Sequence, residues 1–237
     1  MTDKEYLEKY LSKDKLKEGL EKLKQGLPVQ YIVGNVDFYG NILKVNKNVL
    51  IPRFETETLV EKTIEYSKKN LKEPYKIIDL GTGSGAIAIT LKKHLNCSID
   101  AIDISSEALK VAEENAKNNG AEINFFQSNM LESVKDKYDI IISNPPYIAH
   151  DENVEDIVKN NEPHIALYAK NNGLEFYQKI LEKANKHLNK PGLIALEIGA
   201  NQGEKIKKIG QKYFNKDSIK VEKDLTGKDR YVFIFNK

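Results

Sequence analysis

The stretch IIDLGTGSG, at positions 77–85 of a chain of 237 residues, decides the fold. An apolar run leads into three glycines at alternate positions, which let a backbone turn tightly and let a ligand approach closely. The spacing is not the G-x-G-x-x-G of dinucleotide sites, and the stretch lacks the Gly-Lys-Ser/Thr end of a phosphate loop. It therefore predicts either a plain strand-to-helix turn or a cofactor loop of another kind.

Asp103 favours the cofactor loop. It ends the next predicted strand, 18 residues after Gly85. A carboxylate at that place can accept hydrogen bonds from both hydroxyls of a ribose. Asp103 could instead cap the helix predicted over 105–119, but Ser105 can cap that helix itself. We therefore expect Asp103 to bind a ribose.

Outward from this stretch, strands and helices alternate. The patterns predict strands at 75–80, 98–103, 122–127, 138–143 and 192–198, and helices at 55–70, 85–95, 105–119, 173–189 and 202–213. Such alternation is typical of an α/β fold with a parallel, doubly wound sheet. The last two strands, 217–223 and 230–236, are joined by too short a link for a parallel crossover, which predicts an antiparallel hairpin.

The chain before this region has a different pattern. Residues 1–27 carry apolar side chains at helical spacing, which predicts a short N-terminal helical segment that Pro28 ends. Residues 28–57 form a connecting β-hairpin and loop, with two short strands around a Gly40-Asn41 turn. Residues 58–237 then form the main domain.

Composition excludes several classes of protein. Hydrophobic residues make up 40% and charged residues 30%, as in ordinary soluble globular proteins. Cys97 is the single cysteine, and no apolar run approaches the ~18 residues of a membrane helix, so we expect a cytoplasmic protein without a membrane partner. Four scattered histidines predict no metal site. A net charge of +2 makes a direct nucleic-acid target unexpected.

The fourth predicted strand runs into Asn144-Pro145-Pro146-Tyr147. The two prolines end the strand and stiffen the backbone, and their nitrogens cannot donate hydrogen bonds. The Asn144 side-chain oxygen and the Pro145 carbonyl would then form a rigid pair of acceptors beside the ring of Tyr147. This segment predicts a site for a planar NH2 group; a plain turn would need neither this asparagine nor this tyrosine.

Together these features resemble S-adenosylmethionine-dependent methyltransferases that modify planar amide or amino nitrogens. The resemblance implies a Rossmann-like class I methyltransferase sheet, with S-adenosyl-L-methionine as methyl donor and S-adenosyl-L-homocysteine as product. The implied cofactor-binding residues are Gly81, Thr82, Gly83, Ser84, Gly85, Asp103, Met130 and Asn144. The implied catalytic residues are Asn144, Pro145 and Tyr147, and Pro146 joins them in substrate binding.

The flanking segments resemble the HemK/PrmC family of peptide-chain release-factor glutamine methyltransferases. The matching segments are 28–34, 38–40, 49–57, 162–163, 166–167, 173–174, 197–199 with Gln202, and 227–230. The resemblance implies methylation of the amide nitrogen (N5) of the glutamine in the Gly-Gly-Gln motif of release factors. Ribosomal-protein glutamine methyltransferases are an alternative, although they typically carry a Ser-Pro-Ile-type sequence where Glu55-Thr56-Glu57 stands. Adenine-N6 DNA methyltransferases and a non-catalytic scaffold are further alternatives.

The chain departs from the family pattern at three places. Phe54 replaces the usual proline, Asn129-Met130 replaces an Asp-Trp-like pair, and the helical segment before Pro28 is shorter than the usual domain. The short segment predicts that docking of the release factor differs here. Outside the motifs, we expect His150 to be an exposed loop residue, and Glu162 is either a site residue or a carboxylate at a helix boundary.

Overall fold

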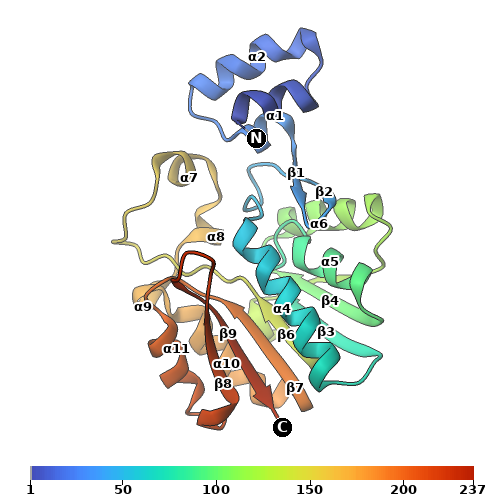
Figure 1. The fold of residues 1–237 in the computed structure, drawn as a ribbon, viewed down its shortest axis with the longest axis vertical. Helices are drawn as coiled ribbons and strands as arrows, with labels where there is room; N and C mark the ends of the chain where they lie inside the picture. Colours follow the sequence, from blue (N-terminus) through green and yellow to red (C-terminus); the bar gives the residue numbers. More distant parts are fainter. Residues whose placement is uncertain (1) are drawn as a thin grey trace.

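The computed structural model describes residues 2–237 and is built around one seven-stranded sheet in the order β5-β4-β3-β6-β7-β9-β8 (Figure 1). Its strands are β3 (Tyr75–Leu80), β4 (Cys97–Asp103), β5 (Asn124–Gln127), β6 (Tyr138–Ser143), β7 (Leu188–Glu197), β8 (Ile219–Lys223) and β9 (Asp229–Asn236). Strands β3 to β7 pair in parallel, and β9 pairs antiparallel with both β7 and β8. The predicted parallel sheet with an antiparallel C-terminal hairpin is confirmed.

Helices cover both faces of the sheet. One core contains side chains of α4 (Phe54–Asn70), α5 (Ala86–His94) and α6 (Ser106–Asn118); the other contains those of α10 (Glu175–His187) and α11 (Gly203–Gly210). Side chains alternate between the faces of a strand, so Ile77 belongs to the first core and Ile78 to the second. Both are fully buried, which explains why these strands are almost continuously apolar.

The order of strands reverses at β3. After β3 the chain moves outward through β4 and β5, and then returns to pair β6 with the other side of β3. Ligands of such sheets bind at the carboxyl ends of the strands beside the reversal. Leu80 pairs with Ser143 in register, and the Ser143 hydroxyl donates to the Leu80 carbonyl over 2.6 Å. The glycine loop and the Asn-Pro-Pro-Tyr segment therefore leave the sheet side by side.

The N-terminal segment contains more helices than predicted. The expected helical stretch is broken at Leu11-Ser12 into α1 (Asp3–Tyr10) and α2 (Lys13–Lys24), and α3 (Val29–Val33) follows Pro28. Pro28 therefore begins a helix that the sequence analysis missed, and Gly34, at φ 85°, ends it. These helices pack on one another around the fully buried Leu7. They stand at the end of the molecule opposite the C-terminus (Figure 1).

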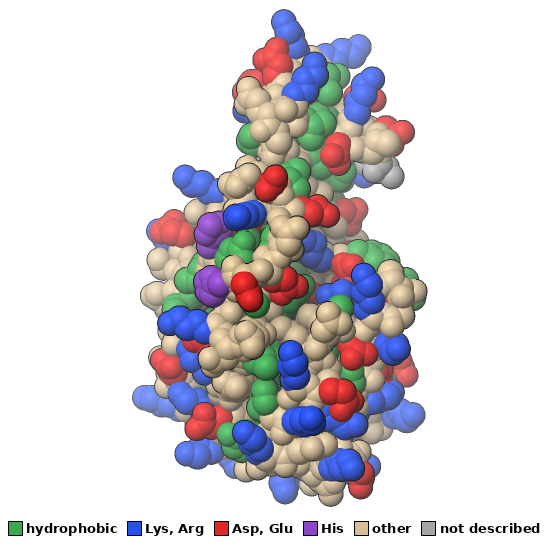
Figure 2. All heavy atoms as spheres, turned by 90° about the vertical axis from the view of Figure 1, so that its left-hand side faces the viewer, with side chains coloured by type: hydrophobic (Ala, Val, Ile, Leu, Met, Phe, Trp, Pro, Cys, Tyr) green, Lys and Arg blue, Asp and Glu red, His purple; other side chains and the backbone are tan. Residues whose placement is uncertain are grey.

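Several hydrogen bonds connect residues 2–34 to the remainder, among them one from the Tyr31 hydroxyl to the Val49 carbonyl over 2.6 Å. The Tyr6 hydroxyl donates to the Asn35 carbonyl over 3.2 Å, and Asn161 Nδ2 donates to the Gly26 carbonyl over 3.0 Å. Figure 2 shows a strip of hydrophobic side chains on this part of the molecule with acidic and basic side chains around it, and charged side chains of both signs over the rest of the face shown. The N-terminal helices thus form a projection that carries an apolar strip on an otherwise charged surface.

The connecting hairpin differs slightly from expectation. β1 (Asn35–Phe38) and β2 (Asn41–Lys44) pair antiparallel, and the turn is Tyr39-Gly40, with both residues at positive φ. The predicted Gly40-Asn41 turn is therefore wrong by one residue. Asn41 belongs to β2, where it pairs with Phe38, and its buried side chain donates to Thr90 Oγ1 over 3.2 Å.

Other element boundaries also shift. β5 begins two residues later than predicted, β7 begins four residues earlier, and α10 begins only at Glu175, because Asn171 and Asn172 adopt left-handed conformations. Short helices precede it, namely α7 (Asp156–Asn161), α8 (His164–Leu167) and α9 (Lys170–Gly173). No helix among residues 2–237 is both long and apolar enough to cross a membrane.

Candidate active site

Two adjoining cavities lie at the carboxyl ends of β3 and β6. The first is lined by Gly81, Gly83, Asp103, Met130, Asn144 and Pro146, among others, and the second by Arg53, Asn144, Pro145, Tyr147, Glu155 and Val158, among others. Leu50, Asn144 and Ala166 line both cavities. Asn144, the first residue of the Asn-Pro-Pro-Tyr segment, therefore lies at the boundary between the two cavities.

The glycine loop is shaped by positive φ angles. Gly81, Gly83 and Gly85 have φ of 71°, 55° and 83°, a region that residues with a side chain adopt only at a cost. A Cβ on Gly83 would meet nothing within 4 Å, so the backbone there is open to a ligand. A Cβ on Gly85 would lie 3.3 Å from the Cβ of Ala112, so that glycine serves the packing of α5 on α6.

Thr82 and Ser84 lie behind the cavity wall, as Gly85 does. The Thr82 hydroxyl donates to Asp79 Oδ2 over 2.7 Å, and the Ser84 carbonyl accepts from Asn115 Nδ2 over 2.9 Å. Their part in cofactor binding stays a prediction, and in this structure they fix the shape of the loop. Asp79 is fully buried, and its Oδ1 is a buried oxygen without a hydrogen-bond partner among the described residues.

Asp103 is held toward the loop by two main-chain groups. Its Oδ2 accepts from Gly83 N and its Oδ1 from Ser105 N, each over 2.9 Å. Burial raises the pKa of Asp103, and the backbone donors at Ser105 and Gly83 oppose this rise. The hydroxyl of Ser105 caps α6, because Ala108 N donates to it over 3.2 Å. Asp103 therefore does not supply that cap, and each carboxylate oxygen keeps a lone pair for a ligand.

Met130 forms the wall opposite the glycines. Its φ of 49° lies in the left-handed region, and the Ser128 hydroxyl holds it there by donating to its carbonyl over 2.7 Å. The Met130 methyl lies 4.0 Å from where a Cβ on Gly81 would be. Such backbone conformations cost of order 1–3 kcal/mol and cluster at binding sites. Met130 is thus fixed over the loop, next to Asn129.

Asn144 is bonded to the buried Thr56 and, through it, is connected to the buried Glu197. Its Nδ2 donates to Thr56 Oγ1 over 3.1 Å, and that hydroxyl donates to Glu197 Oε2 over 2.7 Å. Thr56 lies in the first turn of α4 and Glu197 ends β7; they are 4% and 1% exposed. Burial raises the pKa of Glu197 to about 7, although the hydrogen bond from Thr56 opposes the rise. Because the NH2 end of Asn144 is engaged, its Oδ1 remains as an acceptor.

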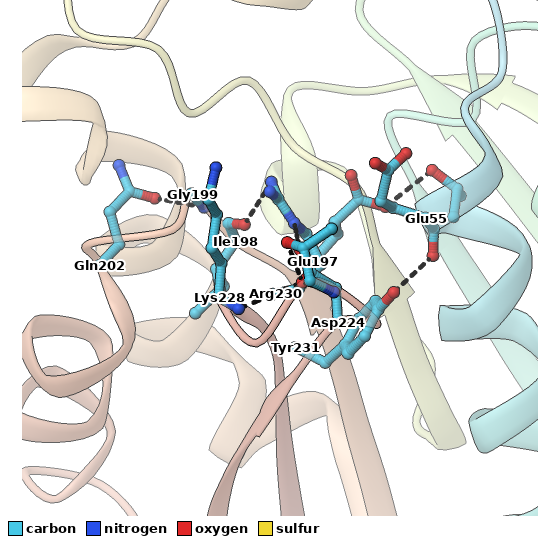
Figure 3. Close-up of polar contacts among 11 residues, drawn as sticks. Glu55, Glu197, Ile198, Gly199, Gln202, Asp224, Lys228, Arg230 and Tyr231 are labelled. Carbon is cyan, nitrogen blue, oxygen red and sulfur yellow. Dashed lines mark hydrogen bonds and ion pairs between the residues drawn. The ribbon is translucent and has the colours of Figure 1, made fainter.

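The main chain at Tyr147 is fixed from two sides. Gln202 Nε2 donates to the Tyr147 carbonyl over 2.9 Å, while Gln202 Oε1 accepts from Gly199 N over 2.9 Å; Figure 3 shows the contact between Gln202 and Gly199. Gly173, at φ 79°, lies so close that a Cβ on it would come within 2.1 Å of the Tyr147 oxygen. Burial raises the pKa of the Tyr147 hydroxyl to about 12, so it stays neutral at physiological pH.

Arg53 and Glu162 form an ion pair at the edge of the second cavity. The Arg53 guanidinium bonds to Glu162 Oε1, and Glu162 Oε2 accepts from Ile51 N over 3.0 Å. Glu162 is almost fully buried and supports the 51–53 segment, whereas Arg53 itself lines the cavity. His150 is exposed and stacks on Tyr168 at 5.3 Å, so the expectation of an exposed loop histidine is confirmed.

Further hydrogen bonds join β9 to its neighbours near Glu197 (Figure 3). Arg230 Nε donates to Asp224 Oδ2 over 3.2 Å and Arg230 Nη1 to the Ile198 carbonyl over 3.3 Å. The Tyr231 hydroxyl donates to the Glu55 carbonyl over 2.9 Å. The β8–β9 turn, the end of β7 and the start of α4 are therefore bonded into one unit around Glu197.

Sequence reasoning missed the apolar part of the cavities. The residues concerned are Val49 and Leu50 before α4, Ile165 and Ala166 in α8, and Phe176 in α10. They carry no polar chemistry that a pattern could detect. Thr56 and Glu197 lay within matched segments, but nothing in the sequence indicated that they meet Asn144.

The fold and the two cavities define the class of Rossmann-like, class I methyltransferases. The "Methyltransferase small domain" family matches residues 56–167. The "Release factor glutamine methyltransferase" of Lactococcus lactis subsp. lactis (strain IL1403) is 47% identical over 222 residues, covering 92% of this chain and 81% of the relative. The chain belongs to the release factor glutamine methyltransferase family.

Solved structures share the fold. A methyltransferase from Pyrococcus furiosus aligns with a TM-score of 0.60 at 22% identity, over 84% of this chain and 90% of that one. The 16S rRNA N2 G1207 methyltransferase of Thermus thermophilus, in complex with AdoMet and guanosine, aligns with a TM-score of 0.62 at 14% identity, over 86% of this chain and 50% of that one. At these identities the likeness concerns the architecture alone.

We expect Asp103→Ala to weaken the binding of S-adenosyl-L-homocysteine by about 1–3 kcal/mol, because ribose hydroxyls would lose a charged acceptor. Titration calorimetry measures this, and circular dichroism monitors folding. Ser105→Ala is the matched control, since it removes the cap of α6 and leaves Asp103 in place. Equal affinities for Asp103→Ala and the wild type would show that Asp103 has no part in cofactor binding.

Stability should fall between about pH 4 and pH 7. Burial raises the pKa of Asp79 and of Glu197 from 3.8 and 4.5 to about 7, so in this range the folded protein binds protons that the unfolded chain has released. The resulting stabilisation is fully present below the two unfolded pKa values and is lost as the pH rises to the folded pKa values of about 7, by several kcal/mol in total. Urea unfolding of the cofactor-free protein measures it. Asp79→Asn should reduce the pH dependence by about half, and stability that rises over this range would contradict the assignment.

Proposed function

We propose that this protein transfers a methyl group from S-adenosyl-L-methionine to the amide nitrogen (N5) of the glutamine in the Gly-Gly-Gln motif of a peptide-chain release factor. The observation that carries the proposal is the place of Asn144 on the shared wall of the two cavities. A glutamine amide bound in the second cavity would lie next to a cofactor bound in the first. The name of the Lactococcus relative supports the release factor as substrate.

The first cavity fits S-adenosyl-L-methionine. Asp103 offers free lone pairs to the ribose, the open backbone at Gly81 and Gly83 allows close approach, and Met130 offers an apolar surface to the adenine. When bound, the cofactor supplies an electrophilic methyl group on a sulfonium ion.

The second cavity orients the glutamine. Asn144 Oδ1 and the Pro145 carbonyl accept the two N–H bonds of the amide, which places the nitrogen lone pair toward the first cavity. Pro146 stiffens the backbone, and Tyr147 packs on the plane of the amide. Preorganised acceptors of this kind also favour the positive charge that develops on nitrogen during transfer.

No side-chain base is required. The amide protons become acidic only after the nitrogen has gained the methyl group, so the acceptors that orient the amide can pass the proton on to water. Tyr147 is neutral because its pKa is raised, and it serves as a surface for packing.

The rim of the second cavity suits a protein loop. Arg53, Val154, Glu155 and Val158 line it, and Phe54 (66%) and Ile157 (38%) are exposed large apolar side chains beside lining residues. Release factors act in the cytoplasm, which we infer to be the location of this protein. A ribosomal-protein glutamine or an adenine amino group presents the same pair of N–H donors, so both belong in the substrate test.

Mass spectrometry decides the substrate. Release factors, ribosomal proteins and adenine-containing DNA are incubated separately with the enzyme and labelled cofactor. A mass gain equal to one CH2 group on the Gly-Gly-Gln glutamine supports the proposal. Label only on ribosomal protein or DNA would contradict it.

We expect Asn144→Ala to lower kcat by ~100-fold or more, the loss typical of one preorganised contact to a transition state. Cofactor affinity should change little, since most of the first cavity is unaltered. Single-turnover assays and calorimetry separate the two quantities. The control is Asn189→Ala. Asn189 lies at the start of β7, at the end of the sheet far from the cavities, where its side chain donates to Asp139. Near-normal turnover of Asn144→Ala would refute the orientation of the amide by this residue.

Deletion of residues 2–24 should raise KM for the release factor and leave cofactor affinity nearly unchanged. The deletion removes α1 and α2, which carry apolar side chains that are only half buried, while the glycine loop and Asp103 stay intact. Titration of both ligands against the folded, truncated protein measures the two effects. Unchanged kinetics would mean that these helices take no part in docking, and loss of cofactor binding would mean that they support the catalytic core.

A further inference from the structure

The side-chain amide of Asn144 has two ends of nearly equal size. Only one end suits the proposed function: Oδ1 toward the second cavity accepts an N–H, whereas an NH2 group there would face the NH2 group of the glutamine. Rotation of the amide by half a turn therefore separates a competent site from an incompetent one. A contact that distinguishes oxygen from nitrogen is needed to fix the rotation.

Thr56 makes that contact, and Glu197 decides its direction. A hydroxyl has a single proton to donate. An ionised carboxylate only accepts, so the Thr56 proton points to Glu197 Oε2, 2.7 Å away. The Thr56 oxygen is then an acceptor for Asn144, which must present Nδ2, at 3.1 Å.

We propose that Thr56 and Glu197 are positioning residues, and that ionised Glu197 acts through the Thr56 hydroxyl to hold Asn144 Oδ1 toward the substrate. A protonated Glu197 can donate to Thr56 instead. The Thr56 proton is then free to point to Asn144 Oδ1, which favours the rotated amide. The hydrogen bonds from Glu197 through Thr56 to Asn144 are called the relay below. The effect of the relay on turnover rests on the proposed function, whereas the relay itself does not.

The surroundings of Glu197 bring the protonation of its carboxylate close to physiological pH. Burial raises the pKa of Glu197 to about 7. The groups that face it are Thr56, Glu55 and Arg53 at the start of α4, Arg230 and Tyr231 in β9, Tyr147 after β6, and Tyr177 in α10. The two arginines favour the ionised form, and Glu55 opposes it. Because the ionised form orients Asn144, turnover should rise with pH through about 7 and be lost below it.

The first experiment is the pH profile of kcat from pH 5.5 to 8.5 at saturating cofactor and release factor. For the wild type we expect an acid limb in which kcat falls up to ~10-fold per pH unit below its midpoint near 7. Glu197→Gln does not titrate, so its kcat should be lower than the wild-type plateau and flat over this range. An acid limb that persists unchanged in Glu197→Gln, or a flat wild-type profile, would overturn the proposal.

The second experiment separates the hydroxyl of Thr56 from its bulk. Thr56→Val should lower kcat by ~10–100-fold with KM for the release factor changed less than ~3-fold, since the reacting amide is misaligned while the docking surface is intact. Thr56→Ser retains the hydroxyl and should restore kcat to within ~3-fold of wild type. The matched control is Thr63→Val, which removes another fully buried hydroxyl of α4, one that donates to the Leu59 carbonyl. Equal kcat for Thr56→Val and Thr63→Val would overturn the proposal.

Nuclear magnetic resonance tests the relay without turnover. The side-chain NH2 signals of Asn144, assigned by their absence in Asn144→Ala, should shift with pH around a midpoint near 7 in the wild type and not in Glu197→Gln. This measurement also decides the matter if Thr56→Val does not fold. If no release factor is methylated but the midpoint is present, the proposed function fails and the relay stands. If methylation occurs and the midpoint is absent, the relay fails alone.

Discussion

The parallel pairing of β3 with β6 is the constraint on which the site depends. These strands are separated along the chain by two further strands and two helices, yet Leu80 and Ser143 lie opposite each other in register. A shift of one residue would turn every side chain of β6 to the other face of the sheet. Polar contacts at both ends of β6 oppose such a shift, because the Ser143 hydroxyl donates to the Leu80 carbonyl and Lys76 N donates to Asp139 Oδ2. The pairing thus sets the relative place of the glycine loop and the Asn-Pro-Pro-Tyr segment.

This pairing also determines which residues line the cavities and which residues hold the lining residues in place. Glycines and apolar side chains form much of the cavity walls together with Asp103, Arg53 and Glu155, whereas the buried carboxylates Glu162 and Glu197 stand behind these walls. Asp103 is held by Gly83 and Ser105, and Asn144 is held by Thr56. Rigid strand ends and helix starts carry all of these groups, which is how a small set of weak contacts can keep precise geometry.

Much of the architecture could be predicted from the sequence. β3 and β6 have the predicted bounds, because turn residues and long apolar runs mark them clearly. Other boundaries were wrong where local and long-range effects compete. Pro28 was taken as an end and in fact precedes α3, and β7 continues back through Pro191 to Leu188 because pairing with β6 at Tyr138 extends it. Such pairings join residues far apart in the chain and leave no local signal.

The candidate site divides in the same way. Gly81, Gly83, Asp103 and the Asn-Pro-Pro-Tyr residues could be proposed from spacing and chemistry, and Met130 from the resemblance to the family; all of them line the two cavities. The Thr56–Glu197 contact joins positions 141 residues apart, and each residue alone reads as an ordinary helix-start threonine or strand-end glutamate. Sequence patterns find groups that face a ligand more readily than the groups that hold them.

The close approach of Gly173 to the Tyr147 carbonyl has a consequence for how this chain tolerates mutation. Even a single methyl group at position 173 would overlap that oxygen, and the left-handed backbone disfavours any replacement as well. Gly173 touches neither substrate nor cofactor in the proposed reaction, yet every substitution there displaces the backbone that carries Pro145 and Tyr147. In a survey of variants, substitutions at this position would therefore reduce activity as strongly as substitutions of the catalytic residues. The cause would be a displaced main chain at Tyr147 and not the loss of a reacting group.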